Sequence, residues 1–356
     1  MLKHLELVNF RNWVKDSFDF AKTTIIVGPN GAGKTNLIEA INLLSTGRSW
    51  RTKKDTEVIS WGSDFAKIAG KAENEKSLNL EIIIQPLLSF ERPKIKQVKI
   101  NGVKKKLTDI LGLMPSVLFS PEEIQLIDGA PVLRRRFIDI LLCQVNRKYA
   151  LALLDLAKII RGRNRLLYYL KIGKANLNEI DFWDEKLVIL GSFILTRRKQ
   201  AIDDLNKDLS QIYGEISGQE EKLQIKYKAT VSGDNFQKIL LLNRQKEIEH
   251  TATLYGPHRD DLVFLLENKN ITTFASRGEY RSAILALKVA EQKYLTKEKN
   301  FPPILLLDDV FSELDKRRRL HLVKVIKLGQ TIITTGDPGQ IETEIKKDAK
   351  IIELKS

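Results

Sequence analysis

The sequence predicts an α/β fold in which a head with a β-rich lobe carries an inserted, mostly helical arm. Three observations support this. A β-branched apolar run, Thr23–Val27, precedes a glycine-rich loop and a helical pattern, which is typical of a strand buried on both faces of a sheet. Residues 134–172 and 182–214 keep a 3.6-residue apolar period. The strand pattern returns near the C-terminus, at Ile304–Leu307.

Composition restricts the class of protein. The chain has 356 residues, of which 43% are hydrophobic and 29% charged, as in soluble globular proteins. No run approaches the roughly 18 apolar residues of a membrane span, and the N-terminus lacks the apolar core of a signal peptide, so we expect a cytoplasmic protein. One cysteine, Cys143, forms no intramolecular disulfide, and the four histidines form no zinc-type cluster. The net charge of +14 favours a polyanionic partner.

The first 107 residues are predicted to form several strands and one helix. Residues 5–10 and Thr23–Val27 are strand-like, and residues 35–44 carry leucine and isoleucine at helical spacing. In residues 56–107, apolar and polar residues alternate in short stretches, which is typical of an antiparallel β meander. Within it, Asn101-Gly102 predicts a two-residue hairpin, because both positions of a type I′ turn need positive φ.

The middle of the chain is helical. The two long helices should pack antiparallel as an arm because a short loop joins them, and Gly162 is a candidate break in the first. At 1.5 Å per residue this arm reaches roughly 50 Å. We therefore predict a head from residues 1–120 and 252–356, and a helical arm from residues 121–251.

A glycine-rich loop supplies the strongest chemical signal. It matches the pattern G-x-x-x-x-G-K-[ST] after a buried strand and at the start of a helix, where backbone N–H groups and the helix dipole favour a phosphate. Lys34 can bridge the β- and γ-phosphates of ATP, and Thr35 can ligate Mg²⁺. The predicted ATP-binding residues are Gly28, Pro29, Asn30, Gly31, Ala32, Gly33, Lys34 and Thr35.

Two carboxylates end the apolar strand at residues 304–307. A buried strand of this kind delivers Asp308 beside the phosphate loop, where it can hold Mg²⁺ together with Thr35. Asp309 follows at the strand end and is placed to activate the attacking water. We therefore predict Asp309 and Lys34 as catalytic residues.

A third motif, Ser276-Arg277-Gly278, opens a helical stretch and predicts a second anion site at a helix N-terminus. The order of phosphate loop, Ser-x-Gly helix, Asp-Asp strand and Ser312-Glu313-Leu314-Asp315 resembles the ABC-type ATPases. The resemblance is most specific to the RecF family, which is SMC/Rad50-like. It rests on Asn9–Asn12 and on the stretches 28–51, 120–139, 255–261 and 303–319.

This resemblance implies an ATP-dependent DNA-binding protein that acts at single-strand gaps and stalled forks, together with RecO- and RecR-like proteins. It also implies weak, DNA-dependent ATP hydrolysis and an ATP-dependent homodimer, in which Ser276, Arg277 and Gly278 act on the partner's ATP. Glu279 stands where the family usually has glutamine; it either weakens pairing or only caps the helix. Gln125 is a candidate glutamine-loop residue.

Basic residues form two clusters. Residues 131–200 hold 15 Lys+Arg and 6 Asp+Glu, and a second cluster decorates the predicted hairpin. We interpret both as sequence-independent contacts to the backbone of single-stranded, gapped or duplex DNA. The candidate DNA contacts are Arg161, Arg163, Arg165, Lys104, Lys105 and Lys106, with Arg92, Lys94, Lys96 and Lys99 nearby.

Two other classes of protein also contain a glycine-rich phosphate loop of this kind. A nucleotide-binding subunit of a membrane transporter is the main alternative, but 241 positions separate Thr35 from Ser276, far more than in transporter cassettes. A basic arm also has no role at a permease. A P-loop kinase leaves the Ser-x-Gly helix unexplained. The sequence thus favours the DNA-repair function over both.

Overall fold

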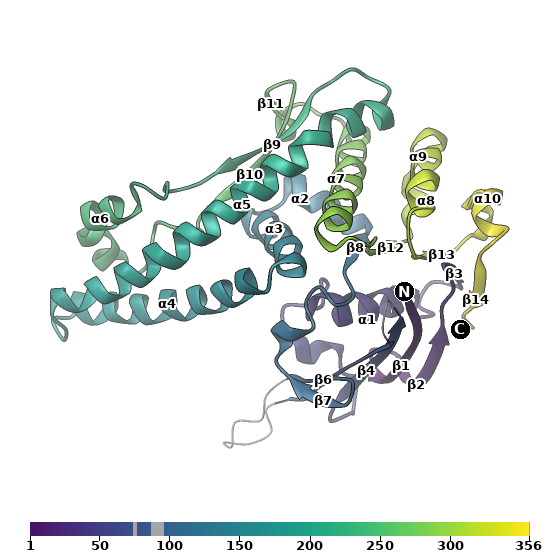
Figure 1. The fold of residues 1–356 in the computed structure, drawn as a ribbon, viewed down its shortest axis with the longest axis horizontal. Coiled ribbons are helices and arrows are strands. Elements are labelled where there is room, and N and C mark those ends of the chain that lie inside the picture. Colours follow the sequence, from purple (N-terminus) through teal and green to yellow (C-terminus); the bar gives the residue numbers. More distant parts are fainter. Residues whose placement is uncertain (74–76, 87–95, 356) are drawn as a thin grey trace. The chain divides into compact units, whose positions relative to one another are not determined.

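Two units, each built from separate stretches of chain, make up the computed structural model, which describes residues 1–73, 77–86 and 96–355 (Figure 1). The first comprises Met1–Ile124, Gln211–Glu220 and Ser276–Ser356, and the second Gln125–Ser210 and Glu221–Ala275. This division differs from the predicted boundaries. Residues 252–275 belong to the second unit because a strand there pairs with one that precedes residue 251, and residues 211–220 belong to the first.

A five-stranded parallel sheet positions the nucleotide motifs of the first unit. Its order is β14-β3-β13-β12-β8, and every neighbouring pair is parallel. The predicted strands at residues 23–27, 304–307 and 331–335 are confirmed, and the two outer strands are additions. The bounds are β3 (Thr23–Val27), β8 (Ser116–Phe119), β12 (Ile304–Asp308), β13 (Thr331–Thr335) and β14 (Lys350–Glu353).

A six-stranded antiparallel sheet forms the predicted β-rich lobe. Its order is β2-β1-β4-β5-β6-β7. The hairpin prediction is confirmed, since Asn101 and Gly102 have φ of 50° and 80°. The bounds are β1 (Leu2–Phe10), β2 (Trp13–Asp19), β4 (Ala66–Glu73), β5 (Ser77–Ile84), β6 (Lys96–Ile100) and β7 (Val103–Lys105).

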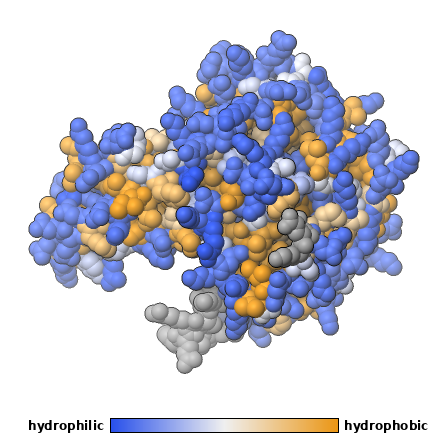
Figure 2. Space-filling view, in the orientation of Figure 1, coloured by the Kyte–Doolittle hydropathy of each residue, from blue (hydrophilic) through white to orange (hydrophobic). Residues whose placement is uncertain are grey.

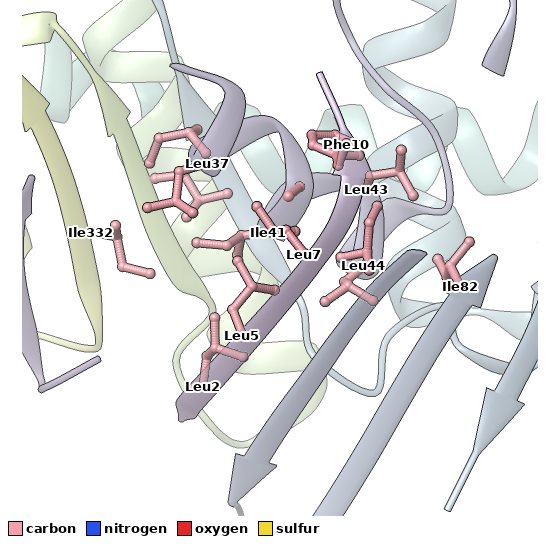
Figure 3. Close-up of a cluster of buried hydrophobic side chains, with 14 of the residues drawn as sticks. Leu2, Leu5, Leu7, Phe10, Leu37, Ile41, Leu43, Leu44, Ile82 and Ile332 are labelled. Carbon is pink, nitrogen blue, oxygen red and sulfur yellow. The ribbon is translucent and has the colours of Figure 1, made fainter. Parts of the chain in front are cut away.

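The helix α1 (Lys34–Thr46) lies in the core that the two sheets share. Figure 3 shows Leu37, Ile41 and Leu44 of this helix among side chains of β1 and β5 and beside Ile332 of β13. All residues from Leu37 to Ser45 are buried. Each such leucine or isoleucine contributes about 1.5–3 kcal/mol relative to its exposed state, so the start of α1 is firmly fixed.

The remaining helices of the first unit follow the predicted order of motifs. The helix expected at residues 279–295 is longer by several residues at its ends, and three shorter helices follow. They are α7 (Arg277–Lys299), α8 (Val310–Glu313), α9 (Lys316–Ile326) and α10 (Thr343–Lys346).

The second unit is the predicted arm, with a small sheet added. Its three strands have the order β11-β10-β9 and are antiparallel. The bounds are α2 (Gln125–Asp128), α3 (Pro131–Val145), α4 (Arg147–Lys171), α5 (Ile180–Ser217), β9 (Leu223–Lys228), α6 (Phe236–His250), β10 (Asp261–Leu266) and β11 (Lys269–Asn270). The last residues of α5, from Gln211 on, belong to the first unit. Among all described residues, none of the helices has the length and apolar character of a membrane span.

The break in the first predicted helix lies at Asn146 and not at Gly162. Asn146 is extended, and its side chain accepts a hydrogen bond from the N–H of Tyr149, which caps α4. Gly162 lies inside the continuous helix α4, and Trp183 of α5 packs against it, so that a Cβ there would lie 2.2 Å from the indole. The glycine thus permits the close approach of two neighbouring helices (Figure 1).

Candidate nucleotide site and nucleic-acid surface

The glycine-rich loop connects β3 to α1, as the sequence predicts. Gly31 and Gly33 have φ of 86° and 94°, a region that other residues rarely occupy. At Gly33 a Cβ would also lie 2.6 Å from the amide of Asn12. Both conformation and space therefore require glycine in this loop.

Lys34 holds the loop closed with its own ammonium group. Its Nζ donates to the carbonyl oxygens of Gly28 at 2.6 Å and Pro29 at 2.9 Å. The residue is only 8% exposed. A phosphate in the loop would meet this charge together with the N–H groups that begin α1.

Thr35 and Asp308 come together from opposite ends of the chain. The Thr35 hydroxyl donates to Asp308 Oδ1 at 3.0 Å, and Thr334 of β13 donates to the same oxygen at 2.7 Å. Burial raises the pKa of Asp308, while the two hydroxyls act in the opposite direction. A threonine hydroxyl and a carboxylate are oxygen ligands of the kind Mg²⁺ prefers, so the donor set fits the metal.

Asp309 lies at the end of β12 in a left-handed conformation, with φ of 50° and ψ of 30°. Its N–H donates to the carbonyl and the hydroxyl of Thr334, at 3.2 and 3.1 Å. Its side chain is exposed and makes no capping bond to α8. For a non-glycine residue this conformation is less favourable than the ordinary backbone regions by about 1–3 kcal/mol. The surrounding strand end therefore has to stabilise Asp309 in it.

The signature loop, Ser276–Gly278, opens α7. Ser276 is the N-cap: its hydroxyl accepts from the N–H of Glu279 at 3.3 Å, and the Glu279 carboxylate accepts from the N–H of Ser276 at 2.6 Å. This is a complete capping box. Glu279 therefore caps the helix, and its carboxylate stays beside the exposed Ser276 and Arg277, so the cap does not exclude the weaker pairing that the sequence also allows.

Arg163 is a correction to the predicted DNA contacts. Its side chain is fully buried and donates to Asp184 at 2.7 Å, Glu247 at 2.6 Å and Thr253 Oγ1 at 3.1 Å. On α4 it points away from the face that Arg161 occupies. A residue without exposed surface cannot reach a phosphate, so the role of Arg163 is structural.

The other predicted contacts of the arm are exposed. Arg161 lies free on the surface of α4, and Arg165 lies 5.5 Å from the ring centre of Tyr169 and donates to its hydroxyl. In Figure 2, hydrophobic residues interrupt the hydrophilic surface where the arm helices lie. Arg161 and Arg165 thus remain candidate DNA contacts on the surface of α4.

Of the basic residues predicted around the hairpin, fewer are exposed and unpaired than the sequence suggests. Lys104, Lys105 and Lys106 are exposed at or just after the edge strand β7. Lysine on an edge strand also prevents pairing with other sheets. Lys96 pairs with Asp55 and Lys99 with Glu81, and Arg92 and Lys94 lie outside the described residues.

Sequence reasoning missed a buried charge network beside the phosphate loop. Glu39 of α1 has no exposed surface, and both nitrogens of an Arg11 fork donate to it, at 2.9 and 2.6 Å. Arg51 and Ser49 complete its partners. A single buried glutamate inside an apolar helix is a signal for such a network, because a charge in the core needs partners.

His258 contacts a turn of the second unit. Its Nε2 lies 2.9 Å from the Thr253 carbonyl, and burial lowers the pKa of the imidazole. Nearby, Asp260 binds the N–H and hydroxyl of Thr230 and the hydroxyl of Tyr227. These contacts agree with a structural role for the histidine. Gln125 is exposed at the start of α2.

Comparison with known proteins defines the class. The family described as RecF/RecN/SMC N terminal domain matches residues 1–353, and the chain belongs to it. Within this class it is similar to the DNA replication and repair protein RecF of Lactobacillus johnsonii, with 40% identity over 99% of this chain and 97% of the relative. RecF of Geobacillus kaustophilus is 35% identical over 100% and 98% of the two chains. These matches make the chain a member of the RecF family.

Solved structures agree with this assignment. A structure of the recombination mediator protein RecF with ATP, described within the RecFOR pathway, has a TM-score of 0.88 and 31% identity, and covers 96% of this chain and 93% of that one. An SMC head bound to the C-winged helix domain of ScpA has a TM-score of 0.55 at 18% identity, with 99% and 93% covered. The second likeness concerns the fold alone, and it supports the predicted fold of the head.

Proposed function

We propose that this protein is an ATP-dependent DNA-binding protein of replication and recombinational repair, which acts in the cytoplasm at single-strand gaps. The observation that carries the proposal is the hydrogen bond between Thr35 and Asp308, which brings together two motifs 273 positions apart at the proposed nucleotide site. The RecF relatives, similar from end to end, support the same function. They do not support the alternative of a transporter subunit.

ATP would bind with its phosphates in the loop of residues 28–35. Lys34 would exchange its two carbonyl partners for phosphate oxygens, a stronger charge-assisted interaction. Thr35 and Asp308 would hold Mg²⁺, which neutralises charge on the phosphates. Asp309, exposed and fixed at the strand end, would orient the attacking water and accept its proton.

The second half of the site would come from a second copy of the chain. The signature loop of each subunit would receive the γ-phosphate of the ATP bound to the other, so that ATP drives dimerisation. Turnover should be slow, because a dimer has to assemble before the short Asp309 side chain can act. The solved RecF structure is described within the RecFOR pathway, and we extend to this chain RecR- and RecO-like proteins as partners.

Sedimentation velocity tests the dimer. Wild type should dimerise with ATP, while Lys34→Ala should lose ATP binding and Ser276→Arg should bind ATP but stay monomeric. Lys316→Ala, which changes an exposed lysine of α9, is the matched control and should dimerise. ATP-dependent dimers of Ser276→Arg would refute the composite site, and normal ATP affinity of Lys34→Ala would refute the assigned loop.

A salt titration tests the DNA surface. If about six phosphates are contacted, the slope of log affinity against log salt should be near −5, with little dependence on DNA sequence. Replacing Arg161 and Arg165 together with glutamine should reduce the slope by about two units. Lys207→Gln is the control, because this exposed lysine already pairs with Asp204 at 2.5 Å. An unchanged slope in the double variant would move the DNA surface away from α4.

A further inference from the structure

Arg318 of α9 binds the first turn of α7 at two points. Its Nη2 donates to the Gly278 carbonyl at 2.8 Å, and its Nε donates to the hydroxyl of Ser282 at 2.9 Å. Gly278 belongs to the signature loop, and Ser282 lies one helical turn further along and is fully buried. The planar guanidinium therefore spans one turn of α7 from outside the helix.

The same arginine is fixed on its own helix. Asp315, the N-cap of α9, accepts from the backbone N–H of Arg318 at 2.9 Å and also binds its Nη1. A second ion pair connects the same two regions, between Arg281 of α7 and Glu313 of α8. The segment from Glu313 to Arg318 thus holds the start of α7 through two arginines.

The charge of Arg318 has the wrong sign for helix stability. Helix N-termini favour anions, by about 0.3–1 kcal/mol for an exposed charge, and a cation beside Gly278 opposes the dipole of α7. The arginine is held there by hydrogen bonds and by Asp315. A cation at this place becomes favourable once an anion arrives at the signature loop.

We propose that Arg318 is a positioning residue for ATP hydrolysis in trans. It fixes the signature loop, through Gly278 and Ser282, in the conformation that receives the γ-phosphate bound to the second copy of the chain. Arg318 lies on the helix that follows Asp309 and α8, so it also connects the loop serving the partner's ATP to the strand end serving its own. The inference rests on the composite site proposed above.

Arg318→Ala tests this directly. ATP affinity of the monomer should stay within about twofold of wild type, because the phosphate loop is untouched. The dissociation constant of the ATP-bound dimer should rise at least about tenfold, as expected for the loss of hydrogen bonds from a charged group. Arg318→Lys should fall between the two, since a single ammonium replaces the fork with a point charge. Lys316→Ala, on the same helix, should match wild type.

Mixing of variants separates positioning from folding. Lys34→Ala keeps an intact signature loop, and Arg318→Ala keeps an intact phosphate loop. A mixed dimer therefore contains one complete composite site, and the mixture should turn over more ATP than either variant alone at the same protein concentration. If Arg318→Ala were misfolded, mixing it with Lys34→Ala would not restore ATP turnover.

Three results decide between the explanations. If wild type stays monomeric with ATP, the proposed composite site fails, and this inference fails with it. If wild type and Arg318→Ala dimerise equally well, only the inference is overturned. If Arg318→Ala binds ATP normally but the mixture with Lys34→Ala turns over no more ATP than either variant alone, Arg318 does not act through the partner's site and the inference is again overturned.

Discussion

Replacing Arg163 with glutamine should destabilise the arm without reaching the nucleotide site. Its guanidinium is the centre of a buried network that joins Asp184 of α5 and Glu247 of α6. Removing one partner from a buried ion pair typically costs about 3–5 kcal/mol, because the other charge stays buried without compensation. Here the cost should lie near the lower end. Asp184 keeps Arg244 at 2.8 Å, and Glu247 keeps the backbone N–H of Leu254 at 2.7 Å.

A loss of about 3 kcal/mol is a large share of the 5–15 kcal/mol that stabilises a typical domain. For a chain of 356 residues, with an unfolding entropy of about 2.1 cal/mol/K per residue, it corresponds to a fall in Tm of about 4 °C. Thermal unfolding followed by circular dichroism measures it, with Arg161→Gln as the exposed control on the same helix. ATP binding should be retained below the transition. A Tm of Arg163→Gln within about 1 °C of Arg161→Gln would refute the buried network.

Three further predictions concern a pH effect, a packing contact and a cap. Burial, with a smaller effect of the Glu123 carboxylate, raises the pKa of Glu291 from 4.5 to about 7, while Lys288 acts in the opposite direction. The free energy of unfolding should therefore fall by about 3 kcal/mol as pH rises from about 4.5 to 7. Glu291→Gln should flatten this dependence in denaturant titrations, and an unchanged pH profile would contradict it. Gly162→Ala should lower Tm, because the clash with Trp183 outweighs the gain of about 1 kcal/mol in helix propensity; a raised Tm would show that the indole can move. Glu279→Gln should strengthen the ATP-dependent dimer, measured by sedimentation.

The geometry of the candidate nucleotide site was predictable from sequence because most of it is local. Strand, glycine loop and helix follow one another within 24 residues at 23–46, and the loop's glycines are required by the backbone itself. Asp308 could be placed because a buried parallel strand has one carboxyl end, where such residues meet. The contribution of Thr334 could not be derived in this way, since it depends on which strand neighbours β12.

The arm shows where sequence reasoning stops. Arg161, Arg163 and Arg165 look alike as residue types, and helical spacing distinguishes only the direction of Arg163. That this direction leads into a buried cluster depends on Glu247 of α6, which is 84 positions away. The predicted boundary at residue 252 differs from the division into units for the same reason. β10 pairs with β9 across α6, and the local pattern of residues 252–275 does not indicate that partner.

Glu279 differs from the glutamine usual at this position in charge alone, and the capping geometry shows why charge decides its effect. The Ser276 hydroxyl accepts from the N–H of Glu279, which leaves its own proton free to donate to a phosphate. The carboxylate occupies the Ser276 N–H, and a glutamine oxygen can accept the same bond. Glu279→Gln therefore keeps both halves of the cap and removes one negative charge beside the expected γ-phosphate. If the dimer of this variant is no tighter than wild type at low salt, the carboxylate lies too far from the partner's nucleotide to oppose it.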